Sequence, residues 1–303
     1  MRDFVERHFR HFNAGELRRC AQSLSAFLDN DGRLMLTLAG AMSTAEIGKS
    51  LAPAIRAGRI HAICCTGANL EEDLFNLVAH SHYGEIPNWR DLSPREESQL
   101  KNRITNRTLP EEEAIRKIES QLISAWSDTT SRLPHEYLYD LVKNIQPDAN
   151  PADSWLLAAA EADLPLFVPG WEDSTLGNIF AARVLDGSVS AESILGGTHY
   201  MLQLADWYRQ GGDTGFLQVG GGIAGDFAIC VVPMLRQDLG EDIPLWSWFA
   251  QISESSASYG GYSGAPPNEK ITWEKLGIDT PKFIIESDAS IVLPILLTYL
   301  LNE

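Results

Sequence analysis

Basic residues are scarce in this 303-residue chain: 24 Lys and Arg stand against 41 Asp and Glu, a formal net charge of −17. Such a protein repels polyanionic phosphate and attracts small polycations. Long apolar runs are also missing, because the longest, Ile291 to Leu301, is about half of the ~20 residues that span a bilayer. We therefore expect neither a nucleic acid nor a membrane as a partner.

Cysteine is rare, and the four residues Cys20, Cys64, Cys65 and Cys230 form no C-x-x-C pair. Reduced, buried thiols are the expected state. No metal site is expected, since the H-x-H at 80–82 has no third ligand at a helpful spacing. The charged first eight residues contain no apolar secretory segment, so the cytosol is the expected compartment.

Apolar residues make up 44% of the chain, and short apolar runs alternate with amphipathic ones. This alternation predicts one α/β domain over residues 1–303, with a largely parallel sheet covered by helices on both faces. A charge-rich surface excursion is expected from residue 90, and a connection at 147–153. The expected strands are 34–38, 61–65, 164–168, 216–219, 245–252 and 283–285. The expected helices are 14–28, with Asn13 as N-cap, 43–55, 70–80, 111–126, 175–184, 191–208, 223–235 and 290–301.

Four turns that follow strands carry unusual residues, and ligands bind at the carboxyl ends of parallel strands. They are Thr66 to Asp73 (TGANLEED), Pro169 to Asn178 (PGWEDSTLGN), Gly220 to Gly225 (GGGIAG) and Asp288 to Ser290. GGGIAG matches G-x-G-x-x-G and leads into a helix, as dinucleotide-binding turns do.

Each of these turns also has a purely structural interpretation. The three acids at 71–73 suit the dipole of the helix that they begin. Asp173 or Ser174, and likewise Asp288, could be helix N-caps. These alternatives stay open at this point.

Five ordered blocks between about Asn13 and Leu300 resemble the deoxyhypusine synthase family. TGANLEED resembles its T-A-G-G-x-E-E-D, PGWEDSTLGN its P-x-x-x-D-x-S-L-G-D, and GGG its triple glycine. The segment from Ser263 to Lys275 resembles S-G-A…E-A-x-S-W-G-K, and 287–290 resembles A-D-A-S.

The resemblance implies a Rossmann-like, NAD-dependent homotetramer with active sites at subunit interfaces. The family moves an aminobutyl group from spermidine to an amine, either a lysine of a translation factor or, in homospermidine synthases, putrescine. It implies Lys275 as the catalytic, imine-forming lysine. The NAD contacts that it implies are Thr66, Gly67, Ala68, Asp173, Gly220, Gly221, Asp288 and Ala289. The polyamine contacts that it implies are Glu71, Glu72, Asn178, Glu269 and Trp273.

This chemistry suits the residue types. A lysine attacks only when neutral, and an apolar setting beside Trp273 would lower the pKa of Lys275. Trp273 would also offer an aromatic face to a protonated amine. Glu72 and Glu269 would bind ammonium groups, in keeping with the acidic chain.

The chain departs from the family pattern at several substrate contacts. Asn178 replaces an aspartate, Gly225-Asp226-Phe227 replaces K-H-H, and Tyr262 replaces the acid of G-S-D-S-G. The turn of the first NAD contact is reduced to Ala39-Gly40-Ala41-Met42-Ser43. The pattern resembles the bacterial deoxyhypusine synthase-like branch, which favours a small amine acceptor such as putrescine. The alternatives are a protein lysine as acceptor and a non-catalytic relative that binds NAD or polyamine.

Overall fold

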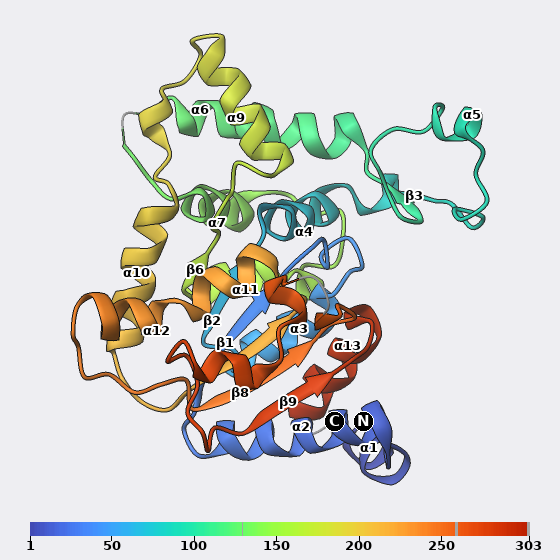
Figure 1. Cartoon of the computed structure of the whole chain (residues 1–303). Coiled ribbons are helices and arrows are strands. Elements are labelled where there is room, and N and C mark those ends of the chain that lie inside the picture. The colour runs from blue at the N-terminus through green and yellow to red at the C-terminus, as the bar shows by residue number, and fades with distance from the viewer. Residues whose placement is uncertain (129, 258–259, 302–303) are drawn as a thin grey trace.

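The computed structural model describes residues 1–128, 130–257 and 260–301, and its centre is a six-stranded parallel sheet (Figure 1). The strands are β1 (Arg33–Leu38), β2 (Ala62–Cys65), β6 (Leu166–Phe167), β7 (Thr214–Val219), β8 (Trp248–Ile252) and β9 (Lys282–Ile285). Their order across the sheet is β6-β2-β1-β7-β8-β9, with every neighbouring pair parallel. The chain therefore runs outward from β1 in both directions, which is the doubly wound Rossmann order.

Helices cover both faces of this sheet, so its central strands are buried throughout (Figure 1). This explains why they read as continuous apolar runs rather than alternating ones. The longer helices are α2 (Phe12–Asp29), α3 (Gly48–Arg56), α4 (Gly67–Ala79), α6 (Lys117–Trp126), α7 (Pro134–Asn144), α9 (Thr175–Leu185), α10 (Gly197–Arg209), α11 (Gly222–Ile229) and α13 (Ala289–Leu300). The shorter ones are α1 (Arg2–His8), α5 (Pro94–Glu97), α8 (Trp155–Glu161) and α12 (Val231–Pro233). No helix in the described stretches of the chain is long and apolar enough to cross a bilayer.

The charge-rich excursion contains a small second sheet. β3 (Gly84–Glu85), β5 (Arg107–Thr108) and β4 (Arg103–Ile104) pair in that order and antiparallel, and they project away from the main sheet with α5 (Figure 1). The strands have two residues each, too few for an alternating pattern to announce them. A π-helical turn at Glu111–Arg116 then leads into α6.

Several boundaries differ from the sequence prediction. Asn13 does not cap α2, which begins at Phe12; its side chain bonds the backbone of Glu286 instead. The predicted helix 223–235 is broken into α11, α12 and a π-helical turn at Met234–Asp238, and α10 begins only at Gly197.

Four helices escaped prediction, namely α1, α5, α7 and α8. α7 begins with a proline, but its polar residues Glu136, Asp140, Lys143 and Asn144 recur at helical spacing, a signal that the sequence analysis overlooked. α8 is almost wholly apolar and shows no polar face. α7 packs on α8, which packs in turn on α3.

Asn69, in the first turn of α4, fixes the turn that follows β1. Its buried amide donates to the carbonyls of Gly40 (2.9 Å) and Leu38 (3.2 Å), and its Oδ1 accepts from Ser43 N (3.1 Å). The Ser43 hydroxyl in turn donates to Asn69 O and accepts from Trp155 Nε1. Because Ser43 is held in this way, the expected helix from 43 begins only at Gly48.

Replacing Asn69 by alanine should therefore lower the free energy of unfolding by about 2–4 kcal/mol, because several buried backbone groups lose their partner at once. Asn144→Ala, at the exposed end of α7, should cost well under 1 kcal/mol. Urea denaturation of the two variants makes the comparison. Equal losses would show that Asn69 does not organise this turn.

Candidate functional site

The glycine-rich turns meet at the carboxyl edge of the sheet. Thr66 Oγ1 donates to Gly40 O (2.7 Å), which joins the turns after β2 and β1. A Cβ at Gly67 would lie 2.6 Å from Ser174 Cβ, and one at Gly220 would lie 2.8 Å from Ala39 Cβ. The structure thus brings three of the four turns marked in the sequence, those after β2, β6 and β7, together with the turn after β1.

The turns after β1 and β7 flank the point where the strand order reverses. Gly220 and Gly222 have φ of +75° and +53°, and Gly40 has +63°, values that side chains strongly disfavour. A Cβ at Gly40 or Gly222 would meet no atom within 4 Å. The backbone is therefore open to a close approach from outside at both turns.

Two of the three consecutive acids of α4 are structural. Glu71, fully buried, accepts from the backbone N–H groups of Thr175 (2.8 Å) and Leu176 (2.7 Å), at the N-terminus of α9. Asp73 accepts from Ser154 Oγ (2.6 Å) and Leu156 N (3.0 Å), at the N-terminus of α8. The acids complement the dipoles of neighbouring helices rather than of their own. Both oxygens of Glu71 accept from the N-terminus of α9, a capping role that the sequence analysis did not predict, and its contact with polyamine stays a prediction.

Glu72 lies between them and has a different environment. It is 4% exposed and accepts a hydrogen bond from the Thr44 hydroxyl. Burial, followed by the negative charge of Glu71, raises its pKa to about 8. Glu72 therefore holds a proton at neutral pH.

The remaining edge residues also have structural partners. Ser174, not Asp173, is the N-cap of α9, and Asp288 is the N-cap of α13, its Oδ1 accepting from Ser290 N (2.7 Å). Ala289 is the first residue of α13. Asp173 and Asn178 are exposed, and the Asn178 amide donates to the Ser174 carbonyl.

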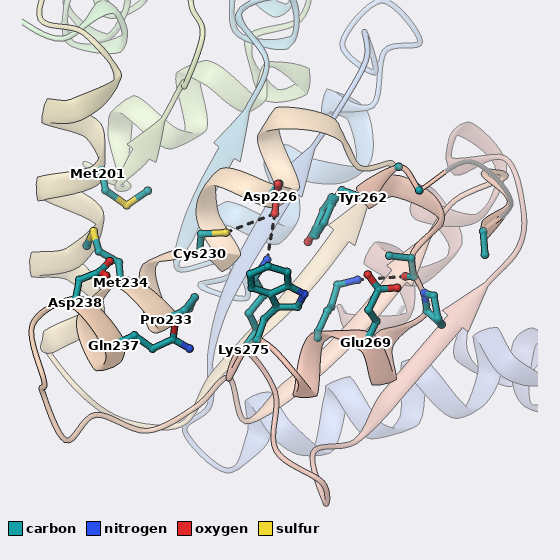
Figure 2. A pocket seen from close by; sticks show the side chains of 17 residues that line it. Met201, Asp226, Cys230, Pro233, Met234, Gln237, Asp238, Tyr262, Glu269 and Lys275 are labelled. Atoms are coloured by element: carbon teal, nitrogen blue, oxygen red, sulfur yellow. Dashed lines mark hydrogen bonds and ion pairs between the residues drawn. The ribbon is translucent and has the colours of Figure 1, made fainter.

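A cavity of about 600 Å³ holds Lys275, Glu269 and Trp273, three residues that the sequence singled out (Figure 2). Lys275 is 7% exposed, and its Nζ lies 3.2 Å from Asp226 Oδ1 on α11. The same Nζ lies 5.4 Å and 6.0 Å from the ring centres of Tyr262 and Trp273. The Trp273 side chain is 59% exposed, so the indole is available to a ligand.

Lys270 also lines this cavity, and sequence reasoning missed it. It is 2% exposed, with Nζ 4.8 Å from the Tyr262 ring centre and 5.1 Å from that of Phe249. Burial, with the positive charge of Lys275 adding to it, lowers the pKa of Lys270 to about 8. Its only sequence signal is that it replaces the alanine of E-A-x-S-W-G-K.

Two of the departures from the family pattern, Asp226 and Tyr262, line this cavity. Asp226 is the ion-pair partner of Lys275, and the Tyr262 hydroxyl donates to Gln218 Oε1 (2.6 Å). A Cβ at Gly225 would lie 2.9 Å from the Tyr262 ring, so the tyrosine fits because residue 225 is glycine. Cys230, partly buried, also lines the cavity, whereas the other three cysteines are buried and unpaired.

The protein is a Rossmann-like α/β protein. This class is defined here by the strand order and by the glycine-rich turns where that order reverses, and a cavity containing lysine adjoins them. The family model for deoxyhypusine synthase matches residues 6–300, and the chain belongs to the deoxyhypusine synthase family.

Curated relatives agree with this assignment. A deoxyhypusine synthase-like protein of Nostoc punctiforme is 30% identical over 99% of this chain and 80% of its own length. One from a Cyanothece species is 29% identical over 99% and 79%. Among solved structures, one from Entamoeba histolytica assigned to the deoxyhypusine synthases superposes with a TM-score of 0.61 at 13% identity, over 98% of this chain and 91% of that one. At that identity the last comparison supports the fold alone.

Glu72 predicts a pH-dependent stability. Its folded-state pKa lies above its unfolded value, so the stability is fully present below about pH 4.5 and is lost as the pH rises through 8. Glu72→Gln keeps the shape and cannot ionise. It should match the wild type at pH 4 and exceed it by about 2–4 kcal/mol at pH 9.

Chemical denaturation across this pH range tests the expectation, with Glu112→Gln on the exposed surface as the control. A difference between wild type and Glu72→Gln that does not grow with pH would show that Glu72 is ionised in the fold at every pH.

Proposed function

We propose that this protein is an NAD-dependent transferase that moves an aminobutyl or related alkyl-amine group between polyamines, with Lys275 carrying the group as an imine. The acceptor is a small amine of the putrescine type. One observation carries the proposal: a lysine amine buried in a ligand-sized cavity, within reach of a carboxylate and two aromatic rings.

NAD suits the glycine-rich edge. The open space beside Gly40 and Gly222, on either side of the reversal point, leaves room for a dinucleotide against the backbone. Thr66, Gly67, Ala68, Gly220 and Gly221 would hold it there. Asp173, Asp288 and Ala289 complete the proposed set. When bound, NAD would accept hydride from the carbon beside the donor's secondary amine and later return it.

Asp226 is the proposed proton acceptor for Lys275. The carboxylate 3.2 Å away takes a proton from the ammonium, and the neutral amine adds to the substrate's C=N carbon. The bond from that carbon to the departing amine then breaks, and the amine leaves with the proton. For a spermidine donor the departing amine is 1,3-diaminopropane. The acceptor amine then adds to the same carbon, the bond from that carbon to Lys275 Nζ breaks, and Lys275 is released.

Glu269 and Trp273 are the proposed ligands of the substrate's ammonium groups, through charge and through the aromatic face. Glu72 is retained as a proposed contact, which would bind an ammonium group of the substrate after losing its proton. Asn178 is retained as a proposed contact through its exposed amide. A homotetramer with interfacial sites is part of the proposal, as the family resemblance implies.

Lys275 can be tested directly by trapping. Protein incubated with NAD and spermidine, then treated with borohydride, should carry a four-carbon amine adduct on Lys275. Lys275→Ala should lose the adduct and at least about a thousandfold in turnover, because covalent catalysis is removed. Tandem mass spectrometry locates the adduct.

Lys101→Ala, on the exposed excursion, is the control and should behave as the wild type. Product formation that survives Lys275→Ala would refute the imine role. Label recovered on a protein lysine instead of a small amine would replace the proposed acceptor by the protein alternative, and no adduct with any donor would favour a non-catalytic relative.

A further inference from the structure

Lys270 is a buried cation that lacks a carboxylate partner. Its Nζ donates to the Ala265 carbonyl at 3.3 Å, and no carboxylate oxygen of the described residues lies within the 4.0 Å of an ion pair. With a pKa of about 8, the side chain is mostly protonated at neutral pH. Burying an unpaired ammonium costs free energy. A lysine in this state on a cavity wall therefore indicates that a negatively charged group of a ligand binds there.

The neighbouring lysine shows the contrast. Lys275 has Asp226, whereas Lys270 is held only between the Tyr262 and Phe249 rings and one carbonyl. A polyamine carries positive charge alone, and each of its ammonium groups would be repelled by Lys270. A second substrate that is also a pure polycation would increase this repulsion.

The cavity carries both signs of charge. Asp226, Asp238 and Glu269 line it together with the two lysines. Its volume of about 600 Å³ is within the range of sites that hold a drug-sized ligand, so a small acceptor fits beside an alkyl-amine chain. Charges of both signs on one wall suit a molecule that itself carries both.

We propose that Lys270 binds a carboxylate of the acceptor, so that the acceptor is an amino acid-type amine rather than a plain diamine. This inference rests on the proposed function and specifies its substrate class. The carboxylate pairs with the Lys270 ammonium through a charge-assisted hydrogen bond, and the acceptor's free amine is thereby directed toward the imine carbon on Lys275.

Binding provides a test that does not need turnover. Ornithine and putrescine differ by one carboxylate, and isothermal titration should show ornithine binding at least about tenfold more tightly to the wild type. Lys270→Met should remove this preference, and Lys270→Arg should keep most of it. Lys101→Met is the matched control. Putrescine binding as tightly as ornithine, or a preference that survives in Lys270→Met, would overturn the proposal.

Folding of Lys270→Met is checked by its melting temperature, which should not fall, because the variant removes a buried unpaired charge. If the melting temperature of Lys270→Met does fall, the test rests on Lys270→Arg, which keeps the positive charge. Loss of the ornithine preference in Lys270→Arg then overturns the proposal.

Turnover separates the two levels of inference. A kcat/KM for aminobutyl transfer to ornithine that is at least about tenfold higher than for putrescine, with this preference lost in Lys270→Met, supports both the proposed function and the role of Lys270. Equal transfer to both acceptors retains the proposed function and overturns the role of Lys270. Carboxylate-dependent binding without transfer of any kind retains Lys270 as a carboxylate site and overturns the proposed function.

Discussion

The contact between Lys275 Nζ and Asp226 Oδ1 joins the two halves of the site. Asp226 lies on α11, the helix that begins at the last glycine of the triple-glycine turn. One turn of helix therefore separates the glycine-rich edge of the sheet from the lysine cavity. Because α11 is short and packs on β1 and β2, its position is fixed by the sheet. Because Lys275 is paired with Asp226, the ion pair also restrains the position of Lys275 and of the loop that carries it.

The unusual residues around this ion pair form one compensated set. Glycine at 225 makes room for the Tyr262 ring, and the ring lies against both lysine amines while its hydroxyl reaches Gln218. Asp226 pairs with Lys275, which leaves Lys270 as the lysine without a carboxylate at ion-pair distance. Seen separately, each substitution removes a contact of the family pattern. Taken together, they replace a lysine, two histidines and an acid of the family pattern by one carboxylate and an aromatic ring that packs against both lysine amines.

The sheet could be predicted from the sequence because buried parallel strands are short, continuous apolar runs, as at Leu34–Leu38 and Ala62–Cys65. The gathering of Lys275, Trp273 and Glu269 could be anticipated because all three lie within seven consecutive residues of the chain. The burial of Lys270 could not, since a lysine among polar neighbours in the sequence looks solvated, and only the approach of Phe249 from β8 and of Tyr262 buries it.

The roles of the three consecutive acids of α4 also could not be predicted from the sequence, and the structure gives the physical reason. Successive helical residues point about 100° apart, so Glu71 and Asp73 reach different neighbours, the N-termini of α9 and α8. Those termini lie roughly 80 to 105 residues away, and no local pattern reveals them. Backbone N–H groups offset part of the cost of burying the two flanking acids, although burial still raises the pKa of both. Glu72 accepts from a hydroxyl and is repelled by Glu71, and its pKa is raised to about 8, so at neutral pH it is held as a neutral acid with a proton to exchange.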